Sequence, residues 1–385
     1  MTRRDVVIGL LAGWLLVLLS AAVVASALGP PPHRPRQVKE LDHYRYIALA
    51  ESLPGRPADP GTRERPFCYR VLAPALVQAL AGATGASVHA AFWASSMAFL
   101  AAYLAALFLW LRSSGFATAL ALVGTVLAGL TPGAVRWYAY QYWMPDPLCL
   151  LLVTLGLLLA RRRRTAVLAI LGVAGLLTRE TYVLVPAWAA VVWLREDGLR
   201  HAARRFVLAF APGLAAWLLL RLMVEAQGGP SLVEAAREML AFRARHVLDN
   251  QLYFASLGSF GVLVPLLLLR LTRAGAALRA RPADAVLVLL AYGSLAFANN
   301  TDRLLVYALP MLLPPALRTL LGLEAVWGRA AAVALVLGTQ AWFYAVTPGW
   351  GVAGLSVYQP VRWSVVTLCG ALLAAGLVAL RRRDV

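Results

Sequence analysis

Long apolar runs alternate with short polar segments along the whole chain. Because a membrane-spanning helix needs about 20 apolar residues, this pattern predicts an all-α, polytopic integral membrane protein with about 11–12 transmembrane helices. Some runs are shorter than a full span, which indicates helices that are broken or that end inside protein. The runs lie near residues 6–28, 86–111, 116–131, 146–160, 165–178, 181–194, 206–226, 252–270, 283–298, 304–321, 330–347 and 363–380.

Two longer polar stretches, 29–85 and 227–251, interrupt this pattern. In the first, apolar residues recur at helical spacing over 40–53, which predicts an amphipathic helix at the membrane surface. A Pro/Gly-rich loop follows, and then a second helical stretch over 67–80. The second polar stretch has the composition of another surface helix. We expect one transmembrane domain over 1–385 that carries both stretches as extracytoplasmic loops.

The composition narrows the class of protein further. Hydrophobic residues make up 61% of the chain and charged residues 14%, whereas a soluble domain is usually about 45–50% apolar and about 25% charged. An ordinary globular enzyme, a disordered chain and a small disulfide scaffold are therefore excluded. The three cysteines show no metal-ligand spacing, which favours buried thiols.

The net charge of +18 comes from 36 lysines and arginines against 18 aspartates and glutamates. Such an excess is also typical of nucleic-acid binding, but here the arginines gather in short loops between apolar runs, as the positive-inside rule predicts. We therefore expect no nucleic-acid partner, a multi-pass protein of the inner (plasma) membrane, and both termini in the cytoplasm. Ala25-Ser26-Ala27 resembles a signal-peptide cleavage site, but the long apolar stretch before it favours a retained first helix.

Ionisable residues at membrane depth are costly, and they often mark a functional site. Five polar clusters stand at the predicted outer ends of apolar runs, which predicts that they line one extracytoplasmic cavity. They are Asp42 in Asp42-His43-Tyr44-Arg45-Tyr46, Arg70 after Phe67-Cys68-Tyr69, Asp146 in Met144-Pro145-Asp146-Pro147, Arg179 with Glu180 in a tight turn, and Asn299 to Arg303 in another.

Each cluster also has a structural interpretation. Asp42 and Asp146 are placed to cap helices through first-turn amides. Arg179 and Glu180 can form an ion pair that pins a hairpin, and Arg70 can reach toward lipid headgroups. The cluster at 299–303 is equally compatible with a polar turn. No P-loop, GxGxxG, GxSxG or HExxH motif occurs in the sequence, so ATP-driven transport and nucleotide-cofactor chemistry have no support.

The combined pattern resembles the GT-C superfamily of integral-membrane glycosyltransferases, in particular its bacterial protein mannosyltransferase and lipid A aminoarabinose transferase-like group. The resemblance covers residues 1–200, and the family's frequent pair of acids in the first loop is absent, because Glu40 and Asp42 stand two apart. It implies a sugar donor carried on polyprenyl phosphate and an extracytoplasmic active site. Four features carry the resemblance. The first two are an acid in an amphipathic helix of a long first outer loop (Asp42, in DHYRY) and a second outer acid at the start of a later span (Asp146, in MPDPLCLLL). The other two are a basic–acidic pair in a short outer turn (Arg179-Glu180, in TRET) and ten or more spans.

For such a reaction the protein must supply a general base for the acceptor hydroxyl and positive charge for the departing phosphate. We expect Asp42 to act as the base and Arg70 and Arg179 to bind the phosphate. Asp146 would orient the acceptor, or hold a divalent cation (Mg²⁺ or Mn²⁺) together with Asp42. The other residues expected at the site are Glu180 as a further catalytic carboxylate and Tyr44, Tyr69, Asn300, Asp302 and Arg303 as substrate-binding residues. The expected partners are the polyprenyl-phosphate sugar, membrane lipids, and a glycan, lipid or protein acceptor.

Three other functions stay open. A secondary transporter would show internal repeats and charges near the middle of its spans, whereas no repeat is visible and the charges here stand at outer ends. A lipid-linked polysaccharide polymerase, ligase or flippase-type protein typically has a large outer loop late in the chain, and the loop at 227–251 is modest. A non-catalytic assembly protein is the third.

The arginine distribution predicts that the 29–85 loop lies outside the cytoplasm. In intact cells, Pro60→Cys in a chain without its native cysteines should react with a membrane-impermeant maleimide. Arg163→Cys, in a predicted cytoplasmic turn, should react only after the membrane is broken. The reverse labelling pattern would refute this orientation.

Overall fold

The computed structural model describes residues 2–28, 42–53, 64–228, 231–245, 252–297, 301–346 and 355–381. Within these ranges, the side chains of residues 27–28, 42–44, 232, 252, 273–274, 277–278, 302, 355–362 and 381 are outside the description. The described chain consists of helices and the turns that join them and contains no strand, which confirms the predicted all-α fold class.

Six helices within the described ranges are long and apolar enough to cross a membrane, so the chain is a polytopic membrane protein, as predicted. Among the described residues, helices long enough to cross a membrane are fewer than the 11–12 transmembrane helices expected from the sequence. A helix of 14 residues, such as Thr165–Thr178, is about 21 Å long, which is shorter than the ~30 Å hydrocarbon core. The six long helices are Arg3–Ser26, Val88–Ser113, Leu199–Met223, Arg303–Trp327, Arg329–Val346 and Trp363–Leu380, and the shorter apolar helices are Leu72–Thr84, Thr118–Gly129, Thr165–Thr178 and Pro282–Ala296.

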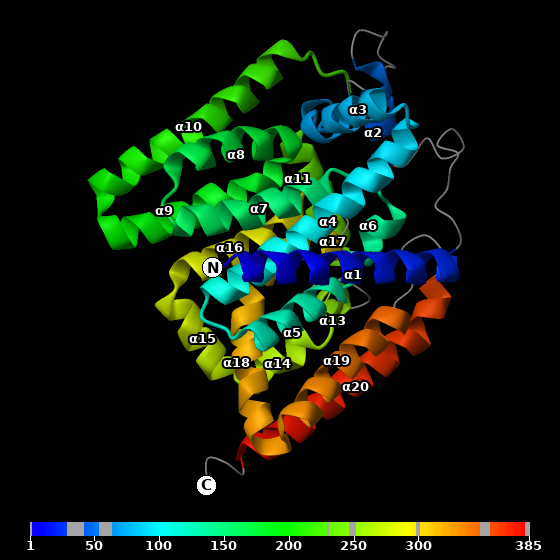
Figure 1. Cartoon of the computed structure of the whole chain (residues 1–385), viewed down its shortest axis with the longest axis vertical. Helices are drawn as coiled ribbons and strands as arrows, with labels where there is room; N and C mark the ends of the chain where they lie inside the picture. Colours follow the sequence, from blue (N-terminus) through cyan, green and yellow to red (C-terminus); the bar gives the residue numbers. More distant parts are fainter. Residues whose placement is uncertain are drawn as a thin grey trace. The chain divides into compact units, whose positions relative to one another are not determined.

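The chain divides into two compact units, whose helices are labelled in Figure 1. Unit 1 comprises Met1–Leu16, Leu107–Trp137 and Glu238–Val385, and unit 2 comprises Val17–Ala106 and Tyr138–Arg237. Four helices of the described chain contribute residues to both units: α1 (Arg3–Leu28), α4 (Val88–Ser113), α6 (Arg136–Tyr140) and α11 (Leu232–Arg245). The division into two compact units does not test the expectation of a single transmembrane domain over 1–385, which stays a prediction.

Unit 1 is built around α18 (Leu309–Trp327), most of which is buried. Contacts with α18 are made by α5 (Thr118–Gly129), α14 (Leu263–Leu269), α16 (Pro282–Gly293), α19 (Arg329–Val346) and α20 (Leu355–Arg381). The unit also contains α12 (Leu252–Phe254), α13 (Leu257–Phe260), α15 (Leu271–Ala280), α17 (Thr301–Leu305) and the 3₁₀ turns η6 (Ser294–Ala296) and η7 (Val306–Ala308).

The run at 252–270, expected to form one span, is instead broken into α12, α13 and α14. The last break falls at Gly261, whose φ of +54° is unfavourable for any residue with a Cβ. The buried side chain of Gln340 holds this turn, since its Oε1 accepts the N–H of Val262 at 2.9 Å and its Nε2 donates to the carbonyl of Leu130 at 3.1 Å.

Unit 2 contains four consecutive helices joined by short connections: α7 (Asp146–Arg161), α8 (Thr165–Thr178), α9 (Leu184–Asp197) and α10 (Leu199–Met223). Both α7 and α10 contact α8 and α9, and the four helices lie side by side in Figure 1. Short connections make consecutive helices antiparallel. The beginnings of α7 and α9 and the ends of α8 and α10 therefore share one end of this four-helix group.

The polar stretch at 29–85 supplies the other elements of unit 2, together with α6 (Arg136–Tyr140), which is shared with unit 1. The helix predicted over 40–53 is present as α2 (Asp42–Ser52), and the one expected within 227–251 is present as α11. The single helix predicted over 67–80 is wrong. A 3₁₀ turn, η3 (Phe67–Tyr69), is separated from α3 (Leu72–Thr84) by Arg70, whose φ of −100° and ψ of 60° are not helical.

Helices α8 and α10 approach each other closely through two glycines. A Cβ placed on Gly213 would lie 2.6 Å from the carbonyl carbon of Gly172, and a backbone atom cannot move aside as a flexible side chain can. Small residues allow this kind of close helix packing in membrane proteins. The contact holds the end of α10 next to the turn that follows α8.

Gly213→Ala should therefore destabilise unit 2 by about 1–3 kcal/mol, the usual cost of overpacking. Gly82→Ala in α3 is the matched control, because nothing lies within 4 Å of the added Cβ, and there alanine should stabilise the helix by up to about 1 kcal/mol. Thermal unfolding in detergent micelles compares the two variants. Equal melting temperatures would contradict the close contact.

Candidate functional site

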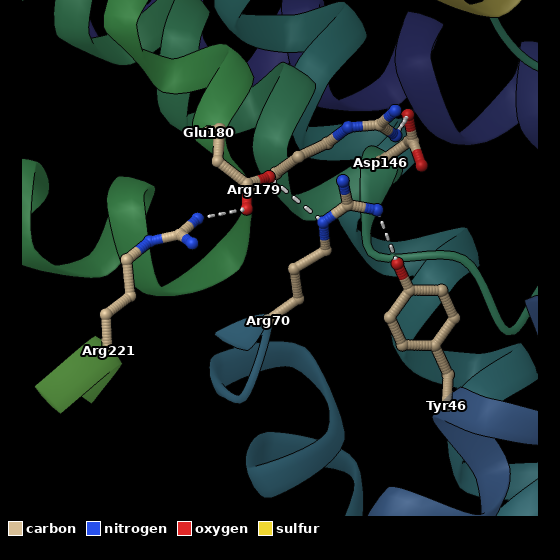
Figure 2. Close-up of polar contacts among 6 residues, drawn as sticks. All are labelled: Tyr46, Arg70, Asp146, Arg179, Glu180 and Arg221. Atoms are coloured by element: carbon tan, nitrogen blue, oxygen red, sulfur yellow. Dashed lines mark hydrogen bonds and ion pairs between the residues drawn. The ribbon is translucent and has the colours of Figure 1, made fainter. Parts of the chain in front are cut away.

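One end of the four-helix group in unit 2 gathers ionisable side chains that are far apart in the sequence. Helix α7 begins with Asp146, α8 is followed by Arg179 and Glu180, and α10 carries Arg221 in its last turn. Arg70, between η3 and α3, joins them (Figure 2). The antiparallel course of the helices brings these residues together.

Asp146 and Arg179 form a salt bridge that is closed to solvent. Nη1 of Arg179 donates to Oδ1 of Asp146, and the two side chains are 4% and 0% exposed. Arg179 follows α8 in an extended conformation, and its backbone N–H donates to the carbonyl of Gly175 at 2.9 Å. Removing one partner of a buried pair leaves an uncompensated charge, so the salt bridge fixes the end of α8 against the beginning of α7.

Glu180 instead bridges two arginines. Its Oε2 accepts a hydrogen bond from Nε of Arg70 and its Oε1 accepts one from Nη2 of Arg221, both at 3.1 Å. Nη1 of Arg70 also donates to the hydroxyl of Tyr46 at 2.8 Å. We call Tyr46, Arg70, Glu180 and Arg221 the outer cluster, because its charged side chains are 13–33% exposed. A ligand can reach this cluster, in contrast to the Asp146–Arg179 pair.

Aromatic rings hold both arginines of the outer cluster. The guanidinium carbon of Arg221 lies 4.2 Å from the ring centroids of both Tyr69 and Trp217, and that of Arg70 lies 5.8 Å from the ring of Phe67. Cation–π contacts of this kind orient a guanidinium without using its N–H donors. The 3₁₀ turn η3 therefore supplies two rings to the site and places the cation of Arg70 directly after them.

The loop before α7 is fixed against α4. The hydroxyl of Ser96 donates to the backbone carbonyl of Tyr142, and the hydroxyl of Tyr142 lies 2.9 Å from Nδ1 of His89. The rings of Tyr142 and Trp143 meet edge to face at 4.9 Å. These contacts set where α7 starts, and a carboxylate in that first turn, as at Asp146, also interacts favourably with the helix dipole.

The arginines decide the charge state of Glu180. Burial raises the pKa of its carboxyl, but Arg70, followed by the backbone and by Arg179 and Arg221, lowers the pKa to below its ordinary value. For Arg70, burial lowers the pKa of the guanidinium, while Glu180, Tyr46 and Asp146 together hold it well above its ordinary value. Three arginines and two carboxylates give the site a net charge of +1 (3 − 2), so an additional anion is favoured there.

Five of the residues predicted for the site, Tyr69, Arg70, Asp146, Arg179 and Glu180, lie in unit 2 and belong to this arrangement. Arg179 pairs with Asp146, and Glu180 with Arg70 and Arg221. The catalytic and binding roles expected of these residues stay predictions.

The other predicted residues lie elsewhere or outside the described residues. Asp42 is the first residue of α2, one helical turn before Tyr46, but its side chain and that of Tyr44 are not described. Asn300 also lies outside the described residues, and of Asp302 only the backbone in α17 is described. Arg303 belongs to α17 of unit 1 and is buried.

Two residues of the outer cluster, Tyr46 and Arg221, were not expected from the sequence. Arg221 stands inside the apolar run at 206–226, where a charged residue is itself a signal of a site. Tyr46 carries no such signal, because tyrosine is common on amphipathic helices. Its position one turn after Asp42 on the same predicted helix is the only indication.

A metal ion does not fit the described side chains. No group of three or more His, Cys, Asp or Glu residues able to hold a metal is present in the described part of the chain, and a guanidinium occupies the Asp146 carboxylate. The side chain of Asp42, the other expected ligand, is not described, so the expected Mg²⁺ or Mn²⁺ stays a prediction.

The fold and this site define a polytopic, all-α membrane protein with an arginine–carboxylate centre in unit 2. The chain matches no protein-family model, no curated protein and no solved structure.

Asp146→Ala or Arg179→Ala should lower the free energy of unfolding by about 3–5 kcal/mol, because each leaves a buried charge unpaired. The double variant Asp146→Leu/Arg179→Met, with apolar side chains of similar size, should recover most of that loss. Unfolding in detergent micelles measures both effects.

The control for this prediction is Glu196→Ala, which breaks a pair with Arg163 whose side chains are 56% and 41% exposed. An exposed pair contributes about 1 kcal/mol at most. If the single variants at Asp146 and Arg179 cost no more than Glu196→Ala, the salt bridge does not stabilise unit 2.

Proposed function

We propose that the protein is a membrane glycosyltransferase that moves a sugar from a polyprenyl-phosphate donor to an extracytoplasmic glycan, lipid or protein acceptor. The observation that carries the proposal is the solvent-accessible outer cluster, in which Arg70 and Arg221 stand at the end of apolar helices within a site of net positive charge. Guanidinium groups bind phosphate oxygens with charge-assisted hydrogen bonds. The resemblance to GT-C glycosyltransferases supports the same donor.

Apolar surface for the donor's tail lies beside these arginines. Leu222 and Met223 directly follow Arg221, and each is 82% exposed; Leu219, one turn earlier, is 57% exposed. A polyprenyl chain lying against this end of α10 would contact these side chains in the place of a lipid tail, through van der Waals packing rather than removal from water. Charge for the phosphate and apolar surface for the prenyl chain thus adjoin each other in unit 2.

The proposed reaction exchanges one bond at the anomeric carbon of the sugar. The acceptor oxygen forms a bond to that carbon while the bond from the carbon to the phosphate oxygen breaks. The acceptor's proton passes to a carboxylate, for which Asp42 is the candidate base. The leaving oxygen keeps the electron pair, and polyprenyl phosphate departs with the additional negative charge that Arg70 and Arg221 stabilise.

The position of the basic residues supports an extracytoplasmic site. Arg161–Arg164 and Arg195–Arg205 stand at the end of the four-helix group opposite to Glu180, at the junctions of α7 with α8 and of α9 with α10. Basic short loops favour the cytoplasmic side. The outer cluster would then face away from the cytoplasm in the inner (plasma) membrane, with both termini cytoplasmic.

The test is transfer of labelled sugar by the purified chain in liposomes, from a panel of short-chain polyprenyl-phosphate hexoses and pentoses. Asp42→Asn should lower transfer by about 10²–10⁴-fold, the usual contribution of a general base, and should leave donor binding intact. Glu51→Gln, an exposed acid of the same helix α2, is the matched control and should keep full activity.

Full transfer by Asp42→Asn would remove Asp42 as the base and leave the glycosyltransferase in place. The absence of transfer from every donor, together with solute uptake into the same liposomes, would favour a secondary transporter.

A further inference from the structure

The carboxylate of Glu180 occupies the two guanidinium groups that the proposed donor needs. We propose that Glu180 is a displaceable counterion, and that the phosphate of a lipid-linked phosphodiester takes over the hydrogen bonds of Arg70 and Arg221 and releases the Glu180 carboxylate. This inference rests on the proposed function and deepens it, because it names the residues that hold the phosphate. It also assigns Arg179 to positioning rather than to phosphate contact.

The geometry around Glu180 is that of an anion held between two cations. Its two carboxylate oxygens accept from different arginines, Oε2 from Arg70 and Oε1 from Arg221, each at 3.1 Å (Figure 2). The two non-bridging oxygens of a phosphodiester can accept the same pair of donors. The carboxylate therefore occupies the place that a phosphate group would take.

The carboxylate leaves part of this donor set unused. Nε of Arg221 is buried and has no hydrogen-bond partner among the described residues. A buried donor without a partner is costly. A phosphodiester has bridging as well as non-bridging oxygens, so it offers acceptors that the carboxylate does not.

Both arginines keep their positions when the carboxylate leaves. Arg221 is held by the rings of Tyr69 and Trp217, at 4.2 Å from each, and Arg70 donates to the hydroxyl of Tyr46 at 2.8 Å. None of these contacts involves Glu180. The proposed phosphate site formed by Arg70 and Arg221 is therefore preorganised, and a ligand does not have to order these two side chains on binding.

Solvent exposure distinguishes the displaceable pairs of Glu180 with Arg70 and Arg221 from the buried pair of Asp146 with Arg179. At 33%, Glu180 is the most exposed charged side chain of the outer cluster, whereas Asp146 and Arg179 are 0% and 4% exposed. An incoming anion therefore reaches Glu180 first and has no path to Arg179 without opening the buried pair. Arg70, Arg221 and Glu180 together carry a charge of +1 (2 − 1), which a monoanionic phosphodiester neutralises.

The experiment measures calorimetric binding of farnesyl methyl phosphate, a phosphodiester with one fixed negative charge, to the full-length protein in micelles. Wild type should bind it, and Glu180→Gln should bind it about 10-fold more tightly, because the competing carboxylate is gone. Arg70→Gln and Arg221→Gln should each weaken binding by at least about 10-fold. Farnesol, which lacks the phosphate, should not bind comparably, and inorganic phosphate as the ligand distinguishes a free-phosphate site from a lipid-phosphate site.

Glu225→Gln is the matched control, since Glu225 is an exposed glutamate four residues after Arg221, and its affinity should equal that of wild type. Unchanged or weaker binding by Glu180→Gln would overturn the displacement, because a carboxylate that only positions the arginines is needed for binding. Tight binding of inorganic phosphate with no preference for the lipid form would overturn the lipid-linked ligand.

A second measurement uses wild type alone and stays informative if Glu180→Gln does not fold. Release from Arg70 and Arg221 raises the pKa of Glu180 toward its ordinary range, so the complex binds more protons than the free protein at acid pH. Affinity for the diester should therefore rise as the pH falls from 6 to about 4. The other ionisable groups that face Glu180 are Arg70, Arg179, Arg221, Tyr46 and Asp146, and Asp146 is bonded to Arg179. Affinity independent of pH would overturn the displacement.

These results are separable from the function itself. Tighter diester binding by Glu180→Gln without any glycosyl transfer would refute the glycosyltransferase and leave the displacement in place. Glycosyl transfer by wild type together with weaker diester binding by Glu180→Gln would support the glycosyltransferase and refute the displacement of Glu180.

Discussion

The arrangement of unit 2 depends on the cost of an unpaired charge in a medium of low dielectric constant. Arg179 and Asp146 stand at helix ends where their side chains are only 4% and 0% exposed, and there an isolated charge is far more costly than a paired one. Pairing requires that the end of α8 meet the beginning of α7. The same requirement governs Arg70 and Arg221, which converge on Glu180 from different elements.

Helix packing makes that convergence geometrically possible. The contact between Gly172 and Gly213 brings the backbones of α8 and α10 closer than any side chains would allow, and Arg221 follows Gly213 by about two turns of helix. A wider spacing would carry its guanidinium away from the carboxylate in the turn after α8. The close packing of α8 and α10 thus contributes to the geometry of the polar site in unit 2.

The pattern of apolar and polar residues predicts where helices lie in the sequence, but it does not predict which side chains pair with each other. The apolar run read as 165–178 coincides with α8, because the polar residues on both sides of it leave little choice of boundary. In contrast, the structural interpretation of Arg179 and Glu180, an ion pair between the two neighbours, differs from the salt bridges in the structure. Arg179 is extended, with φ −167° and ψ 144°, and successive side chains on extended backbone point to opposite sides. The two therefore have different partners, which spacing alone cannot indicate. The break in the helix at Arg70 is unpredictable for a similar reason, since Arg70 bonds to Tyr46 and Glu180, which lie 24 and 110 positions away in the sequence.

The two carboxylates of the site differ in what a ligand can change. Asp146 is enclosed with Arg179, so an arriving anion does not compete with it for that arginine. Glu180 is ionised in the free protein because of the arginines next to it, and a carboxylate stabilised in this way is a weak base. A phosphate that takes those arginines removes the stabilisation and makes Glu180 more basic at the moment when the donor is in place. The arrangement would thus couple donor binding to the appearance of a base beside the phosphate, and Glu180 would join Asp42 as a candidate to accept the acceptor's proton.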